Sequence, residues 1–151
     1  MNAMSASQPL EHFADKAEIR EVLARYMRAM RLHDVDLMDD VFTADAVIDY
    51  SAIGGSKAPW SETKDWLRGM IAVEHFILFV GDVYPTFADD GQTAAVESTW
   101  HGVFVATPDT PPLVIFGTYD DELVRTADGW RISARTDHPA VQVAAALAPQ
   151  S

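Results

Sequence analysis

The residues of this chain that could carry out chemistry are a few histidines and tyrosines within apolar segments. His75 lies near the start of the longest such segment, 73–87, whose β-branched and aromatic residues predict a strand. Because side chains alternate between the two faces of a strand, His75 shares a face with Ile77, Phe79 and Val83. Histidine is the side chain most easily tuned for proton transfer near neutral pH. A histidine in such a segment is more often a core residue with one hydrogen-bond partner than a catalytic residue.

Two tyrosines could supply hydroxyl donors to the same site. Tyr26 lies within an apolar stripe, with residues spaced three and four apart, that predicts an amphipathic helix. Its ring is therefore buried, and its hydroxyl requires a partner, either a structural hydrogen bond or a ligand. Tyr50 ends a short predicted strand, 46–50. A histidine base and a phenolic donor could together remove a proton beside a carbonyl and stabilise the enolate.

A second histidine, His101, lies in the predicted strand 93–106. It shares one face of that strand with Thr99 and Val103, and the opposite face carries Trp100 and Phe104. The register of the strand, and so the direction of His101, stays open. The apolar residues that we expect to shape a substrate cavity are Trp66, Ile77, Phe79, Trp100, Phe104 and Phe116.

Acidic residues could pair with a histidine, and four are available: Asp34, Asp49, Glu97 and Asp137. Asp49 and Tyr50 are adjacent on a strand and point to opposite faces, so both cannot line one pocket without a bulge. For Asp121 and Asp137 a surface or ion-pair role is favoured. No set of histidines and acids has the spacing of metal ligands, so we expect no metal and no cofactor.

The order of elements indicates an α+β protein. Apolar spacing predicts helices at about 13–30, 35–42 and 64–72, and strands at 46–50, 75–87, 93–106, 113–125 and 130–137, followed by a short Ala-rich helix at 139–147. Asp89-Asp90-Gly91 and Ala127-Asp128-Gly129 are hairpin turns, which make the later strands antiparallel neighbours. A long, twisted antiparallel sheet beside amphipathic helices tends to curl and to enclose a pocket between them.

The composition limits the classes of partner. The chain has 151 residues, of which 48% are hydrophobic, and a formal net charge of −12. We expect one domain at 11–148 after a loose tail at 1–10. The negative charge argues against nucleic acid and anionic membranes. No signal peptide and no apolar run of the ~20 residues that a membrane helix needs is apparent, so we expect a cytoplasmic protein.

Four local signatures resemble a known family. They are Ala24–Ala29 followed by His33-Asp34; Phe42–Tyr50; Glu74-His75-Phe76; and Tyr119–Arg125 followed by Asp128–Ile132. The sequence resembles the SnoaL-like branch of the nuclear-transport-factor-like superfamily, which includes scytalone dehydratase, bile-acid dehydratase and polyketide cyclases. The resemblance implies a cone-shaped, curved antiparallel sheet wrapped around N-terminal helices and enclosing a pocket. It also implies a pocket tyrosine at Tyr50, a catalytic histidine at His75 and a second active-site histidine near His101.

One position departs from the family pattern. The dehydratases carry an aspartate at the end of the first helix, which pairs with the catalytic histidine, and Arg31 stands at that position here. An arginine cannot balance the charge of an imidazolium. The histidine therefore pairs with another acid, or this pair is absent.

The sequence thus favours a cofactor-independent lyase (dehydratase) or isomerase acting on a hydrophobic cyclic or polyketide-like molecule. His75 would be the base, Tyr26 and Tyr50 would donate to the developing oxyanion, and His101 would assist. The alternative, favoured by Arg31, is a non-catalytic small-molecule-binding protein or accessory subunit. A water-activating hydrolase of the limonene-epoxide-hydrolase kind needs an Asp-Arg-Asp cluster that the sequence does not provide.

The later strands also predict self-association. They carry apolar residues on both faces: Trp100, Val103, Phe104, Val105, Val114 and Phe116. One face should pack against the core, and the surplus on the other predicts a homodimer formed sheet to sheet.

Overall fold

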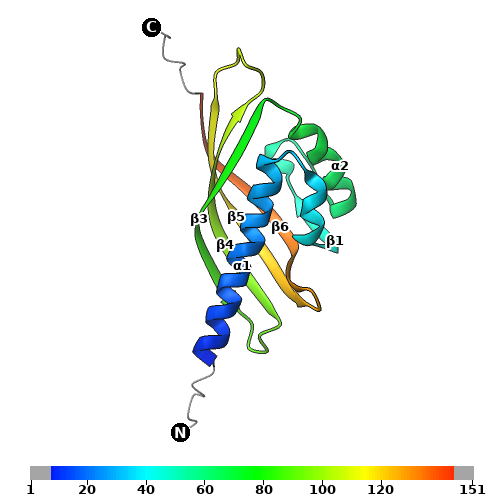
Figure 1. Cartoon of the computed structure of the whole chain (residues 1–151), viewed down its shortest axis with the longest axis vertical. Helices are drawn as coiled ribbons and strands as arrows, with labels where there is room; N and C mark the ends of the chain where they lie inside the picture. Colours follow the sequence, from blue (N-terminus) through cyan, green and yellow to red (C-terminus); the bar gives the residue numbers. More distant parts are fainter. Residues whose placement is uncertain (1–7, 145–151) are drawn as a thin grey trace.

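The computed structural model describes residues 8–144, which form one six-stranded sheet with helices on one of its faces (Figure 1). The elements are α1 (Gln8–Arg31), η1 (Val35–Asp40), β1 (Phe42–Asp49), η2 (Ser51–Ile53), β2 (Lys57–Pro59), α2 (Trp60–Met70), β3 (His75–Phe87), β4 (Thr93–Val105), β5 (Leu113–Thr126) and β6 (Gly129–Ala144). None of these helices is long and apolar enough to cross a membrane.

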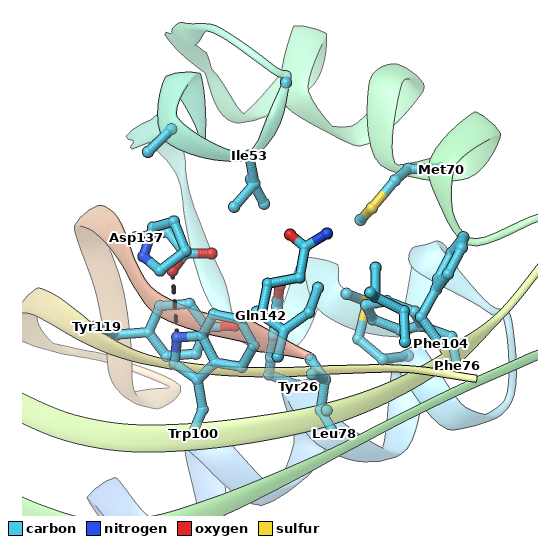
Figure 2. Close-up of a pocket in the computed structure, with 17 residues that line it drawn as sticks. Tyr26, Ile53, Met70, Phe76, Leu78, Trp100, Phe104, Tyr119, Asp137 and Gln142 are labelled. Atoms are coloured by element: carbon cyan, nitrogen blue, oxygen red, sulfur yellow. Dashed lines mark hydrogen bonds between the residues drawn. The ribbon is translucent and has the colours of Figure 1, made fainter. Parts of the chain in front are cut away.

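The sheet is curved and open, with the strand order β2-β1-β6-β5-β4-β3. Strands β3 to β6 are joined by hairpins and are antiparallel, which confirms the predicted α+β class. Strand β1 differs from the prediction of an antiparallel sheet, because it runs parallel to β6. A long α1 lies along one face of the sheet (Figure 1). The inward face of the sheet, α1, η2 and α2 together line a cavity (Figure 2).

Helix α1 forms because its apolar residues make a single stripe that the sheet covers. Ile19, Leu23, Tyr26 and Met30, at spacings of three and four, are all nearly inaccessible to solvent. The helix begins at Gln8, so part of the predicted tail is helical, and residues 1–7 lie outside the described part of the chain.

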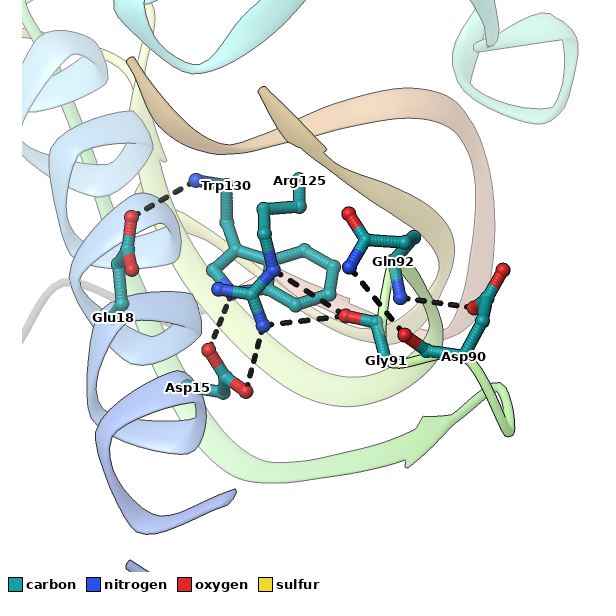
Figure 3. A network of polar contacts seen from close by, with 7 residues as sticks. All are labelled: Asp15, Glu18, Asp90, Gly91, Gln92, Arg125 and Trp130. Atoms are coloured by element: carbon teal, nitrogen blue, oxygen red, sulfur yellow. Dashed lines mark hydrogen bonds and ion pairs between the residues drawn. The ribbon is translucent and has the colours of Figure 1, made fainter. Parts of the chain in front are cut away.

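The N-terminal half of α1 is attached to the hairpins of the sheet by a polar network (Figure 3). Asp15 Oδ1 accepts a hydrogen bond from Trp130 Nε1 at 3.0 Å, and its Oδ2 accepts one from Arg125 Nη2 at 2.9 Å. Glu18 Oε1 accepts from the backbone N–H of Trp130 at 2.9 Å. Burial acts to raise the pKa of Asp15, but the hydrogen bonds from Arg125 and Trp130 leave that pKa below its ordinary value.

A bulge in β3 changes which side chains face inward. Phe76 and Leu78 point toward the helices, and the pairing with β4 shifts register between Val80 and Val83. After this shift Val83 packs against the core, whereas Phe79 on the first half of the strand is 48% exposed. The predicted row that joins His75 and Phe79 to Val83 is therefore wrong, because a bulge reverses the alternation of side chains.

The predicted helix at 139–147 is also wrong over the residues that the structure describes. Strand β6 continues to Ala144, with Pro139 opposite Gly117 and Ala144 opposite Leu113. Pairing with β1 ends at Thr136, so Pro139 lies on the free edge of β6, where its missing N–H costs no ladder bond. Residues 145–147 lie outside the described part.

Candidate functional site

A cavity of about 440 Å³ lies between the sheet and the helices (Figure 2). Strands β3 to β6 supply its floor, and α1, η2 and the end of α2 supply the opposite wall. Most of its lining is apolar, including Met30, Ile53, Met70, Phe76, Leu78 and Ile115. Such a cavity suits an uncharged hydrophobic molecule.

One end of the cavity is polar, and Asp137 on β6 is its acid. The residue is 3% exposed, and its Oδ1 accepts a hydrogen bond from Trp100 Nε1 at 3.1 Å (Figure 2). Burial raises the pKa of Asp137 to about 6, against the opposing effects of the nearby Arg135 charge and the Trp100 hydrogen bond. A carboxyl with this pKa exchanges protons readily near neutral pH, which is the property of a general acid or base.

The indole of Trp100 reaches Asp137 because β5 has a glycine between them. A Cβ atom on Gly117 would lie 2.8 Å from two ring carbons of Trp100. Without that atom, the indole lies across β5 and stacks on Tyr119, with ring centroids 5.5 Å apart and an interplanar angle of 21°. Strands β4, β5 and β6 thus position one hydrogen-bonded pair at the cavity.

Two tyrosine hydroxyls are joined beside this acid. Tyr26 Oη and Tyr50 Oη are 2.7 Å apart, and either can be the donor. Tyr26 lines the cavity, whereas Tyr50 is buried behind it and does not. Burial raises the pKa of both phenols well above the ordinary value. Both therefore stay neutral, and a Tyr26 that accepts from Tyr50 keeps its own O–H to donate to a ligand.

A buried ion pair packs against the rings of Tyr26 and Tyr119. Arg135 Nε and Nη2 donate to the two carboxylate oxygens of Asp121 at 2.7 and 2.8 Å, and both side chains are fully buried. The guanidinium carbon lies 3.8 Å from the ring centroid of Tyr119 and 4.4 Å from that of Tyr26. The positive charge of Arg135 favours negative charge on groups around it, including an oxygen bound at Tyr26.

His75 and His101 lie on the face of the sheet that is opposite to the cavity. His75 is exposed and does not line the cavity. His101 is stacked between Phe79 and Phe116, at centroid distances of 4.7 and 5.8 Å. The prediction that the His75 imidazole projects into the cavity is wrong, because Phe76 and its alternate neighbours occupy the inward face of β3.

The remaining predicted residues divide between the two faces. Trp100 and Phe104 line the cavity with Tyr26, whereas Ile77, Phe79 and Phe116 do not. Trp66 is also outside the cavity and packs beside Tyr50, with ring centroids 5.8 Å apart.

Among the acids considered, Asp34 caps η1 and Asp49 accepts from Ser51. Glu97 is exposed, and only Asp137 lines the cavity. Within residues 8–144, no group of three or more histidines and acids is placed to hold a metal ion.

Sequence reasoning gave too little weight to Asp137 and did not single out Tyr119. The sequence did contain one signal for a buried acid. A tryptophan on the inward face of a strand, such as Trp100, needs a buried acceptor for its N–H. The bulge that turns Asp137 inward has no such signal.

Solved structures share this fold. A protein from Kribbella flavida, Kfla4162, is 27% identical with a TM-score of 0.78, over 87% of this chain and 95% of that one. A nuclear transport factor 2-like superfamily protein from Salmonella enterica has a TM-score of 0.72 at 20% identity, over 86% and 94%. The hexachlorocyclohexane dehydrochlorinase LinA-type3 from Novosphingobium barchaimii has a TM-score of 0.79 at 15% identity, over 95% and 100%. The last two likenesses concern the fold alone.

The family is defined more closely by sequence. The SnoaL-like domain matches residues 11–136, and the chain belongs to this family. An uncharacterized protein of Mycobacterium tuberculosis is 32% identical over 134 residues, which cover 82% of this chain and 84% of that protein. The fold is one whose members include dehydratases and isomerases.

Proposed function

We propose that this protein is a cofactor-independent lyase or isomerase that moves a proton on a hydrophobic cyclic ketone or a related polyketide-like molecule. The observation that carries the proposal is the position of Asp137, a buried carboxyl with a pKa of about 6 at the polar end of an apolar cavity. A neutral tyrosine hydroxyl, that of Tyr26, lines the same cavity. Base and donor are the two groups that enolate chemistry requires.

The reaction would begin with a ligand whose carbonyl oxygen accepts a hydrogen bond from Tyr26. The Asp137 carboxylate takes a proton from the adjacent carbon, and the electron pair of that C–H bond forms an enolate on the carbonyl oxygen. In an isomerisation, Asp137 returns the proton to a different carbon. In an elimination, the enolate expels a β-hydroxyl group, which leaves as water with the proton from Asp137. Arg135 favours the enolate through its charge, and the apolar walls limit access of water.

The base in this proposal differs from the one that the sequence favoured. His75 and His101 are separated from the cavity by the sheet, so neither can reach a ligand inside it. In this proposal Asp137 is the base that His75 was expected to be. A base that is itself a carboxylate needs no acid to pair with it, so the presence of Arg31 in place of the family's aspartate does not prevent the reaction.

Deuterium exchange tests the proposal without knowledge of the natural substrate. We would incubate the protein with 2-tetralone in D₂O and follow loss of the α-proton signals by NMR. Exchange should exceed that in buffer, and Asp137→Asn should reduce it by about 100-fold or more, as expected for loss of a general base. Asp89→Asn, in the exposed turn between β3 and β4, is the matched control and should exchange like the parent. Equal rates for the parent and Asp137→Asn would refute the proposal.

A second function, binding without catalysis, is favoured by a different observation. Among the described residues that line the cavity there is no histidine, and Asp137 is the one carboxylate. A binding protein would hold a cyclic ketone with measurable affinity and show no exchange above buffer. The hydrolase alternative needs an Asp-Arg-Asp cluster that faces the ligand. Arg135 pairs with Asp121 and its charge acts on Asp137, but neither Arg135 nor Asp121 is among the lining residues in the described part of the chain.

A further inference from the structure

We propose that the ligand of this cavity is an elongated, uncharged molecule with two separated hydrogen-bonding groups, and that Gln142 binds the group distant from Asp137. The inference rests on the proposed function in one respect, that the other group is held at Asp137 and Tyr26. It adds a specificity residue and a shape to the ligand class.

Gln142 faces the cavity because of a second irregularity in β6. The pairing with β5 runs from Gly117 opposite Pro139 to Phe116 opposite Val141, so Ala140 is an extra residue on β6. Without this bulge, Val141 would follow Pro139 and Asp137 on the inward face, and Gln142 would point outward. With it, Gln142 lines the cavity and Val141 is 53% exposed on the other side. The bulge places a polar side chain where an apolar wall would have a valine.

The carboxamide of Gln142 has apolar neighbours. It points into the cavity toward Ile53 and Met70 (Figure 2). Gln142 as a residue is exposed to solvent, so its amide lies where the cavity is open. A ligand that enters there displaces water from the amide and must replace the hydrogen bonds that the water made.

The two polar points are separated along the sheet, and the cavity continues past Gln142 to Phe104 and Leu113. Asp137 is opposite Tyr119 on β5, and Gln142 is opposite Ile115, four residues along the same strand. At about 3.4 Å per residue, the backbones of the two sites are about 14 Å apart. Pro139 on β6, opposite Gly117 on β5, lines the space between them, and Leu78 and Ile115 are in register with Gln142. A ligand that contacts both points must therefore be elongated, with its two polar groups separated by an apolar body.

Charge further restricts the polar groups of the ligand. Gln142 is neutral, and within residues 8–144 neither lysine nor arginine lines the cavity. A carboxylate or phosphate at the distant end would lose its hydration without gaining a cation. A hydroxyl or a carbonyl is matched by the amide, which can both donate and accept.

The test is a comparison of two rigid probes, 4-hydroxybiphenyl and 4,4′-dihydroxybiphenyl, by isothermal titration calorimetry. The parent should bind the dihydroxy probe about five to ten times more tightly, as expected for one added hydrogen bond. Gln142→Leu should reduce this preference to the small statistical advantage of the symmetric probe, while still binding 4-hydroxybiphenyl. Gln92→Leu, in the exposed turn between β3 and β4, adds the same leucine elsewhere and should retain the preference. The dihydroxy probe is symmetric and can bind in two equivalent orientations, which gives it a small statistical advantage in both proteins. The affinity ratio of the two probes in the parent is therefore compared with the same ratio in Gln142→Leu.

Three outcomes would overturn the inference: binding of neither probe, no preference in the parent, or an unchanged preference in Gln142→Leu. Its failure is distinguishable from failure of the proposed function. Deuterium exchange of 2-tetralone by the parent tests the proposed function alone, and the difference in probe preference between the parent and Gln142→Leu tests the inference alone. Conversely, a protein that only binds would show the probe preference and no exchange.

Discussion

We expect the substitution Asp137→Asn to stabilise the folded protein above pH ~6 and to leave its stability near pH ~4 almost unchanged. Asp137 as a residue is 3% exposed, and burial raises the pKa of its carboxyl from an ordinary 3.8 to about 6. Asparagine has nearly the same shape and keeps an oxygen that can accept from Trp100 Nε1. It has no charge to bury at any pH.

The magnitude follows from the linkage between protonation and folding. Between the two pKa values, the folded protein holds a proton that the unfolded chain has released, so the free energy of unfolding decreases as the pH rises through this range. The difference of about two pKa units corresponds to about 3 kcal/mol, which the parent loses by pH ~7. Asp137→Asn does not undergo this loss. Its advantage at neutral pH would raise the midpoint of thermal unfolding by roughly 10 °C for a domain of this size.

Urea unfolding of the parent and Asp137→Asn between pH ~4 and ~8 measures this difference directly, since other titrations cancel in the comparison. Asp89→Asn, an exposed aspartate in the turn between β3 and β4, should show no such trend with pH. A difference between parent and Asp137→Asn that stays constant with pH, or that favours the parent at pH ~8, would mean that burial does not penalise the Asp137 charge. The same substitution should remove proton exchange, so the variant would gain stability and lose activity.

Three further predictions concern other parts of the molecule. Asp121→Asn should lower the free energy of unfolding by about 3–5 kcal/mol in urea titrations, because it leaves Arg135 charged and buried without its partner; a loss below ~1 kcal/mol would show that water reaches the pair. His75→Ala should keep the deuterium-exchange rate of the parent, since the imidazole is outside the cavity, and a loss of exchange would restore the histidine mechanism. We also propose that the outer face of the sheet, where Phe79 and Phe116 are 48% and 45% exposed, forms a homodimer; the double substitution of both by glutamate should halve the mass measured by light scattering, and a parent that is already monomeric would contradict this.

Much of the fold could be predicted because its signals are local. The hairpins follow from short turn motifs, and Gly91 and Gly129 adopt the positive φ angles of 67° and 100° that those turns require. The inward direction of Tyr26 follows from the helical stripe of α1. The parallel pairing of β1 with β6 has no local signal, because it depends on where a distant strand is placed.

The site was harder to predict because it depends on bulges. Alternation counted from Ile132 would turn Asp137 outward, but the pairing with β5 shifts register between Leu123 and Glu122 and brings Asp137 inward. A similar shift in β3 separates the face of His75 from that of Val83. A one-residue change of register moves every later side chain to the other face, and neither bulge is encoded by a turn motif.

The network that holds the start of α1 also bears on how the chain is made. The bonds from Asp15 to Arg125 and Trp130 join residues that are 110 and 115 positions apart. During synthesis from the N-terminus, α1 is therefore complete long before its partners in β5 and β6 leave the ribosome. Its apolar stripe stays without the sheet that covers it through most of translation, and contacts of such long range form slowly. The nascent chain therefore exposes this apolar surface until the last hairpin closes.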